Sequence, residues 1–146
     1  MQLNTVHGKA CTGLVTPVAR SFPGIPASVP EARAFVRAQF AGRDDAAVFA
    51  AVMCTSELFT NAIAYTASRL PGREVLVLVY VGVTWTAVHV VNAGEVPPCL
   101  RSRGGMGMGL EIVGCLASSS GVNGCDWWFT VPAVRAAAEP ELEAGL

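Results

Sequence analysis

Apolar residues recur at helical spacing in three segments of the chain and form β-branched or aromatic runs in four others. The predicted helices cover residues 28–41, 46–67 and 110–117, and the predicted strands cover residues 18–22, 75–81, 84–91 and 125–131. The run at 75–81 is apolar on both faces, which indicates a central strand. The order of the elements predicts an α/β two-layer sandwich, with one mixed, mostly antiparallel sheet and helices on one face.

Local signals mark several boundaries of these elements. Ser28 and Glu31 fit a capping box for the first helix, with Pro30 near its first position. Asp44 or Asp45 can cap the second helix. The polar run at residues 118–121, which ends in glycine, predicts a turn before the last strand.

The domain boundaries follow from the same pattern. Residues 1–17 are polar and unpatterned, so we expect a flexible N-terminus. Residues 134–146 are rich in Glu and Ala and predict a flexible tail. One domain at residues 18–133 remains, a length that can bury a sizeable core.

Composition narrows the classes of partner. Apolar residues make up 52% of the chain and charged residues 14%, below the usual ~25%, so apolar surface can remain for a protein partner. The net charge is −1 and the arginines are scattered, which argues against direct nucleic-acid binding. Because we find no apolar run of the ~20 residues that a membrane span needs, we expect no membrane insertion.

The cysteines and the single lysine exclude further classes of site. The cysteine count is odd and no CxxC motif occurs, so neither a disulfide framework nor a zinc site is indicated, and a reducing cytoplasm is the expected compartment. The five cysteines are Cys11, Cys54, Cys99, Cys115 and Cys125. Lys9 is the only lysine, and no Gly-Lys-Ser/Thr motif of a phosphate-binding P-loop is present.

The first candidate site lies in the second predicted helix. Glu57 and Asn61 are four residues apart, so they share one helix face and place a carboxylate beside a carboxamide. Each residue alone is also compatible with a solvated helix surface. Asn is a poor helix former, so an Asn inside a long helix is consistent with a functional role.

The second candidate site is the glycine cluster at residues 104–110. Four glycines in six residues can bring backbone N–H groups to the start of the third helix, where phosphate binds well. They lack the i, i+2, i+5 spacing of a dinucleotide fingerprint. A surface loop remains an alternative for the cluster, as does a simple turn for Asn92 and Gly94 at the end of a predicted strand. Arg101 and Arg103 can neutralise phosphates or solvate the loop.

Taken in order, these pieces resemble the N, G1 and G2 boxes of the histidine-kinase-like ATPases. This is the Bergerat ATP-binding fold of the gyrase and Hsp90 nucleotide domains. Within that group the chain looks most like the small bacterial anti-sigma-factor serine/threonine kinases and their actinobacterial relatives. The resemblance spans residues 18–133 and rests on the segments FPGIPASVPEARAFV, SELFTNAIAYT, VHVVNAGEVPP, GGMGMGLEIVGCLA and GCDWWFTVP.

The resemblance implies a role for each candidate residue. Glu57 matches the general base, and Asn61 matches the ligand of a Mg²⁺ ion that bridges the phosphates of ATP. Gly94 and Asn92 match the positions beside adenine. Gly105, Gly107 and Gly109 match the backbone near the triphosphate, and Arg103, in the loop before them, is a further candidate for contact with the nucleotide because of its charge.

Two departures from the family pattern bear on the activity. Asn92 stands where the family has Asp, so the acceptor for the adenine amino group loses its charge. The loop at residues 95–103 is short for an ATP lid. The resemblance therefore implies a cytoplasmic protein kinase that holds a sigma factor and phosphorylates an anti-sigma-factor antagonist. The alternative is a non-catalytic interaction module of the same fold. With helices on one sheet face, the other face can support a homodimer.

Overall fold

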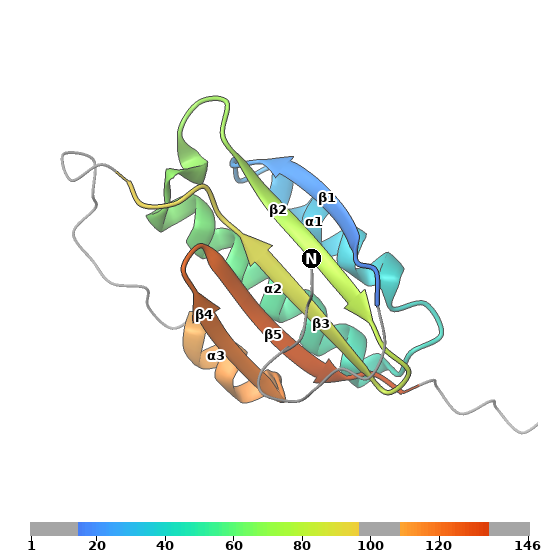
Figure 1. Ribbon diagram of the computed structural model, residues 1–146. Coiled ribbons are helices and arrows are strands. Elements are labelled where there is room, and N and C mark those ends of the chain that lie inside the picture. Colours follow the sequence, from blue (N-terminus) through green and yellow to red (C-terminus); the bar gives the residue numbers. More distant parts are fainter. Residues whose placement is uncertain (1–14, 97–108, 135–146) are drawn as a thin grey trace, which may run out of the picture.

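The strands in the described part of the chain form one antiparallel sheet in the order β1-β2-β3-β5-β4 (Figure 1). The computed structural model describes residues 15–96 and 109–134. The strands are β1 (Val18–Pro23), β2 (Glu74–Val81), β3 (Trp85–Val91), β4 (Ser119–Asn123) and β5 (Asp126–Pro132). Every neighbouring pair is antiparallel. The flexible ends predicted at 1–17 and 134–146 fall almost wholly outside the described residues.

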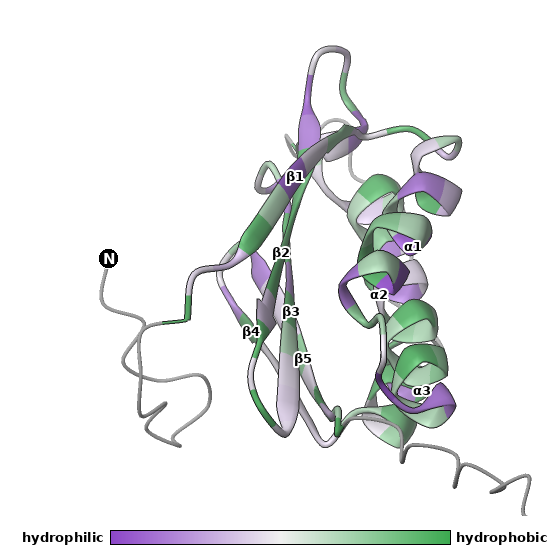
Figure 2. Ribbon diagram, turned by 90° about the vertical axis from the view of Figure 1, so that its right-hand side faces the viewer, coloured by the Kyte–Doolittle hydropathy of each residue, from purple (hydrophilic) through white to green (hydrophobic). Residues whose placement is uncertain are grey.

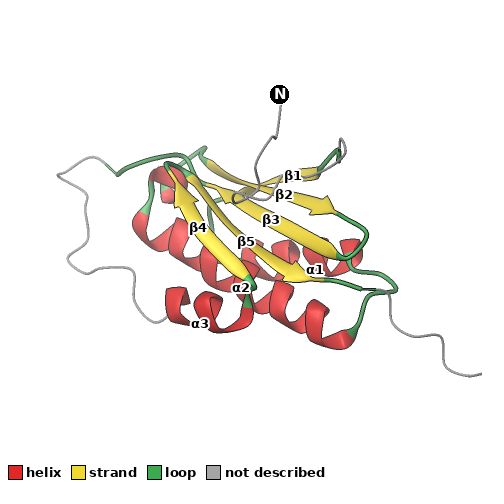
Figure 3. Ribbon diagram, turned by 60° about the horizontal axis from the view of Figure 1, so that its bottom comes forward, coloured by secondary structure: helices red, strands yellow, loops and turns green. Residues whose placement is uncertain are grey.

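The helices cover one face of this sheet (Figures 2 and 3). They are α1 (Ser28–Gln39), α2 (Asp45–Tyr65), the short 3-10 helix η1 (Ala67–Arg69) and α3 (Gly109–Leu116). The longest helix, α2, packs against both α1 and α3. The α/β two-layer sandwich predicted from the sequence is therefore confirmed.

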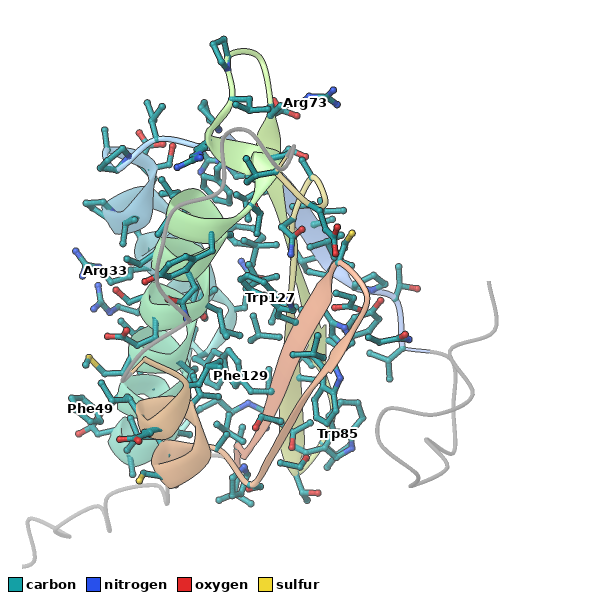
Figure 4. The ribbon with its side chains drawn as sticks, turned by 90° about the vertical axis from the view of Figure 1, so that its left-hand side faces the viewer. Arg33, Phe49, Arg73, Trp85, Trp127 and Phe129 are labelled. Atoms are coloured by element: carbon teal, nitrogen blue, oxygen red, sulfur yellow. The ribbon has the colours of Figure 1, made fainter. Side chains whose placement is uncertain are left out.

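The main core fills the space between the two layers. Alternate residues of β2 and β5 point to the helices, and Trp127 and Phe129 lie between β5 and α2 in Figure 4, whereas Trp85 lies on the opposite side of the sheet. The rings of Phe22 and Phe59 meet edge to face, with 5.9 Å between their centroids. Because this apolar surface leaves water, its burial is the dominant stabilising contribution.

A smaller cluster lies on the sheet face away from the helices. Tyr80 and Ala87 are buried there, and Val15, Leu78 and Trp85 pack against them. The apolar run of β2 therefore faces buried surroundings on both sides, with β1 and β3 as its two neighbours. This arrangement confirms the prediction of an interior strand.

The two predicted helix caps have different outcomes. Asp44 caps α2, since its carboxylate accepts a hydrogen bond from the backbone N–H of Ala47 at 2.8 Å. The capping box at Ser28 is wrong, because Ser28 lies inside α1 and the cap residue Ala27 makes no side-chain bond. The N–H of Ser28 donates to the carbonyl of Ile25 at 3.0 Å, so the preceding turn supplies a hydrogen-bond acceptor at the start of α1.

The turn predicted at residues 118–121 is also wrong, because β4 begins at Ser119. This edge strand pairs with β5 through a hairpin whose turn contains Gly124 at φ 60°. Its small residues have a packing reason: a Cβ at Gly121 would lie 2.4 Å from the ring of Trp128. Polar edge strands of this kind give a weak periodic signal in sequence.

The central helix α2 ends at Tyr65, two residues earlier than predicted, and η1 follows it. The prediction that no segment is long and apolar enough for a membrane span is wrong, because α2 meets both criteria by length and hydropathy. However, 56% of its apolar window is buried inside the protein, as in the core helix of a soluble domain. Its apolarity is thus accounted for by its position between the sheet and two neighbouring helices.

Arg43, in the loop between α1 and α2, forms hydrogen bonds with the end of the sheet that contains the β2–β3 hairpin. Its guanidinium donates to the carbonyls of Gly82 at 3.1 Å and Val83 at 2.9 Å, and also to the carbonyl of Ala133. The planar guanidinium carries several donors in a fixed fork, which suits convergent carbonyls. This contact ties the β2–β3 hairpin to the end of β5, at the opposite end of the sheet from the loop after β3.

Candidate functional site

Asn61 is one of two buried polar residues of α2 with an unpartnered side-chain atom; the other is Thr55. Asn61 is 6% exposed, and its Nδ2 atom, like the Oγ1 atom of Thr55, has no hydrogen-bond partner among the described residues. A buried donor without a partner costs about 1–3 kcal/mol, so such groups are rare and call for an explanation. Glu57 lies one helical turn earlier and is half-buried. Both predicted residues therefore lie on α2, and Asn61 has an unused donor.

The loop after β3 holds the second pair of predicted residues. The backbone N–H of Asn92 donates to the carbonyl of Cys125 at 2.9 Å, so the ladder between β3 and β5 continues one residue past the strand. The side-chain Oδ1 of Asn92 accepts a bond from the N–H of Gly94 at 2.8 Å. Gly94 has a φ of 98°, which other residues adopt with strain. The chain thus makes a tight, hydrogen-bonded turn directly after the strand.

Hydrogen bonds with the residues that directly follow α2 hold this turn in place. The N–H of Ala67 donates to the carbonyl of Gly94 at 2.8 Å, and the N–H of Ala93 donates to the hydroxyl of Ser68 at 2.9 Å. Thr66 forms an isolated antiparallel bridge with Glu95. The structure therefore brings the end of α2 and the loop after β3 together at one end of the sandwich.

Sequence reasoning missed the two hydroxyl residues that make this junction. Thr66 accepts a bond from the N–H of Ser68 at 3.1 Å, and Ser68 donates to the carbonyl of Glu74 at 3.1 Å. Ser68 is fully buried, and its hydroxyl satisfies a donor in one segment and an acceptor in another. The available signal was local, since Ser and Thr beside a helix end often bond to nearby backbone.

The glycine cluster is only partly visible. Arg103, Gly105 and Gly107 lie outside the described residues, as does most of the predicted lid at 95–103. Gly109 is the first residue of α3, so the third helix begins within the cluster, as predicted. The expected contacts of these residues with phosphate stay predictions.

The cysteines of the described segments, Cys54, Cys115 and Cys125, are free thiols, as the lack of a disulfide or zinc pattern indicated; Cys11 and Cys99 lie outside these segments. The sequence predicts that the thiols are mostly buried, which is wrong for Cys115 and Cys125, because both are exposed. Burial, and secondarily the charge of Glu57, raises the pKa of Cys54 from 9.0 to about 12. The thiol is therefore protonated at neutral pH and is a poor nucleophile. Among the described residues no group of three or more His, Cys, Asp or Glu side chains could hold a metal ion. A Mg²⁺ ion, which keeps most of its waters, needs only one or two protein oxygens.

A second polar cluster lies on the sheet face away from the helices. The Nδ1 atom of His89 lies 2.8 Å from each carboxylate oxygen of Asp126, and the Tyr80 ring meets the imidazole edge to face at 5.2 Å. Burial, and secondarily the charge of Asp126, raises the pKa of Tyr80. His89 is thus a hydrogen-bonded strand residue. Its partner, 37 residues away in sequence, was not foreseen.

Comparison with known proteins bears on the fold. No protein-family model matches the chain, and no curated protein matches it. Among solved structures, the chain is similar to the crystal structure of the RsbU and RsbW domains of Rv1364c from Mycobacterium tuberculosis, with a TM-score of 0.60 and 17% identity. The match covers 82% of this chain and 32% of that one, so this chain spans about a third of the neighbour's length. The likeness shows a shared α/β fold, consistent with the histidine-kinase-like fold that the sequence resembles.

Proposed function

We propose that this chain is a regulatory protein of the anti-sigma-factor kinase type, which binds ATP with Mg²⁺ where α2 meets the loop after β3. The observation that carries the proposal is the buried Nδ2 atom of Asn61, which has no hydrogen-bond partner within residues 15–96 and 109–134. It lies one turn before the end of α2, which is bonded to the loop that holds Asn92 and Gly94. A ligand at this junction would give the donor its missing partner.

The residues fit the chemistry of a magnesium nucleotide. A carboxamide offers an oxygen to a hard cation and an N–H to a phosphate oxygen or a metal-bound water, so Asn61 can serve both. Gly94 has no side chain, which lets a flat base approach the turn. Gly105, Gly107 and Gly109 are proposed to surround the phosphates, as the resemblance implies, and Arg103 is proposed to neutralise part of their charge.

Glu57 is the proposed general base. It lies one helical turn from Asn61, and its carboxylate is half-buried. Phosphoryl transfer needs mainly positioning of the reactants and charge neutralisation. A carboxylate that orients the attacking hydroxyl and accepts its proton supplies the remaining catalytic group. The acceptor would be a Ser or Thr of an anti-sigma-factor antagonist, and the second partner a sigma factor, in the cytoplasm. The support for these partners is the sequence resemblance together with the fold shared with a structure that contains an RsbW domain.

A second function is favoured by one specific observation. Asn92 is neutral, and its Oδ1 atom already accepts the Gly94 N–H, so it is a weaker acceptor for adenine than an aspartate would be. The same fold could then serve as a non-catalytic binding module with weak or lost ATP affinity. A homodimer through the sheet face opposite the helices is compatible with either function.

Calorimetric titration of Mg·ATP separates these two functions. The kinase proposal expects saturable binding, and no heat of binding at millimolar ATP would reject it. Glu57→Ala should keep the affinity and abolish transfer of labelled γ-phosphate from ATP to proteins of a native cell extract. Transfer that survives in Glu57→Ala would remove Glu57 from the role of base.

A further inference from the structure

The amide of Asn92 is held in one of its two possible orientations. The N–H of Gly94 lies 2.8 Å from one branch of the amide, and a donor requires an acceptor there, so that branch is the oxygen. The NH₂ branch then points away from the turn. The side chain is 9% exposed, which leaves it little freedom to reorient.

The turn determines what this position can offer to a ligand. An aspartate would give one oxygen to the Gly94 N–H and keep the second as an acceptor. Asn92 uses one lone pair of its only oxygen for the same N–H, and its other polar atom is an NH₂ group, which is a donor. A ligand amino group would have to share that oxygen with the Gly94 N–H, whereas a ligand carbonyl oxygen would meet the free NH₂ donor.

Flipping the amide would not remove this preference. A flip would set the NH₂ group against the Gly94 N–H, and that half-buried backbone donor would lose its acceptor. A lost partner of this kind corresponds to about a tenfold change in affinity. A 6-aminopurine must therefore either bear this cost or share the Asn92 oxygen with the Gly94 N–H, and a 6-oxopurine needs neither.

We infer that Asn92 makes this site select a 6-oxopurine nucleotide, such as a guanosine or inosine triphosphate, over the 6-aminopurine ATP. The inference rests on the proposed function, because it takes the base to lie beside Asn92. It narrows that function from ATP to a purine triphosphate chosen by its 6-substituent. On this inference, Asn92 changes which nucleotide binds, and the chain still binds a nucleotide.

The test is calorimetric titration of the full chain with ATP, GTP and ITP, each with Mg²⁺, in wild type and in Asn92→Asp. Asp can keep the bond to the Gly94 N–H, so the variant is expected to fold, which a thermal melt checks. ITP carries the 6-oxo group of GTP without its 2-amino group and isolates the contact. Asn123→Asp, at an exposed position of β4, is the matched control for the added charge.

The wild type should bind GTP and ITP about tenfold more tightly than ATP. Asn92→Asp should reverse that order, and Asn123→Asp should leave it unchanged. The inference is overturned if wild type binds ATP as tightly as ITP and GTP, or if Asn92→Asp leaves the ratio unaltered; in both cases nucleotide binding itself survives. If wild type binds none of the three, the proposed function fails and the inference fails with it.

Discussion

The hydroxyl oxygen of Ser68 accepts a hydrogen bond from the backbone N–H of Ala93 at 2.9 Å, while its proton goes to the carbonyl of Glu74. One fully buried side chain therefore joins three segments: the end of the helical layer, the start of β2 and the loop after β3. The position of Asn92 and Gly94 relative to α2 depends on this junction.

Ser68→Ala should lower the free energy of unfolding by about 1–3 kcal/mol, because it leaves a buried N–H and a carbonyl without partners. Urea denaturation measures the change. Ser120→Ala, at an exposed position of β4, should stay within about 0.5 kcal/mol of wild type. A Ser68→Ala protein as stable as its control would show that the junction is not a structural link.

Gly24 and Gly114 should respond to alanine in opposite directions. A Cβ at Gly24 would lie 1.7 Å from the carbonyl oxygen of Ser68, so the backbone must shift, and we expect a loss of at least about 1–3 kcal/mol. A Cβ at Gly114 meets nothing within 4 Å in α3, and alanine there should add about 0.5–1 kcal/mol. Thermal melts of both variants test the pair, and equal shifts in melting temperature would contradict it.

The raised pKa of Cys54 predicts a loss of stability at alkaline pH. The unfolded chain ionises this thiol near its ordinary pKa of 9.0, whereas the folded chain holds it protonated to about 12. Stability is thus fully present below pH 9 and declines as the pH rises through 12, by at most ~1.4 kcal/mol per pH unit for this group. Tyr80, whose pKa is also raised, acts in the same direction.

Urea titrations between pH 8 and pH 10.5 check this slope, which should be shallower in Cys54→Ala. Iodoacetamide at pH 8 provides an independent measurement. The exposed thiols of Cys115 and Cys125 should be alkylated while Cys54 stays unmodified. Rapid labelling of Cys54 in the folded protein, or an unchanged slope in the variant, would contradict the assignment.

The sequence could predict the layers because their signals are local and periodic. The β-branched run of β2 and the long apolar stretch of α2 each identify their element without reference to the rest of the chain. The strand β4 was not predicted, because a glycine such as Gly121 is typical of a turn in sequence. In the folded sheet Gly121 is small because the ring of Trp128 lies beside it, and only the fold creates that contact. For the same reason the cap at Ser28 was wrong: the turn at Ile25 had already supplied the acceptor.

The candidate site was predictable in its residues but not in its connections. Glu57 and Asn61 follow from helical spacing, and Asn92 and Gly94 from their place at a strand end. The links from Ala67 to Gly94 and from Ser68 to Ala93 span more than twenty residues of sequence, and no periodic pattern encodes them. The engagement of the Asn92 oxygen by Gly94 likewise depends on the path of the backbone through the turn.

Asn61 should show opposite effects on stability and on binding. Its Nδ2 atom is buried without a partner among the described residues, so Asn61→Leu, an apolar helix former branched at the same carbon atom, should raise the free energy of unfolding by about 1 kcal/mol in the absence of nucleotide. Urea denaturation of the ligand-free protein checks this gain. A destabilised Asn61→Leu protein would mean that the amide is not an unsatisfied group in the free chain.

In the proposed function, Asn61 holds a magnesium nucleotide where α2 meets the loop after β3. This role is tested by measuring nucleotide affinity in wild type and in Asn61→Ala, once with Mg²⁺ and once with EDTA. The nucleotide is ATP or GTP, whichever binds wild type more tightly. Asn123→Ala is the control at an exposed position. The account predicts that EDTA weakens binding to wild type and the control, whereas Asn61→Ala binds weakly in both conditions. Equal affinity and equal Mg²⁺ dependence in Asn61→Ala and wild type would contradict it.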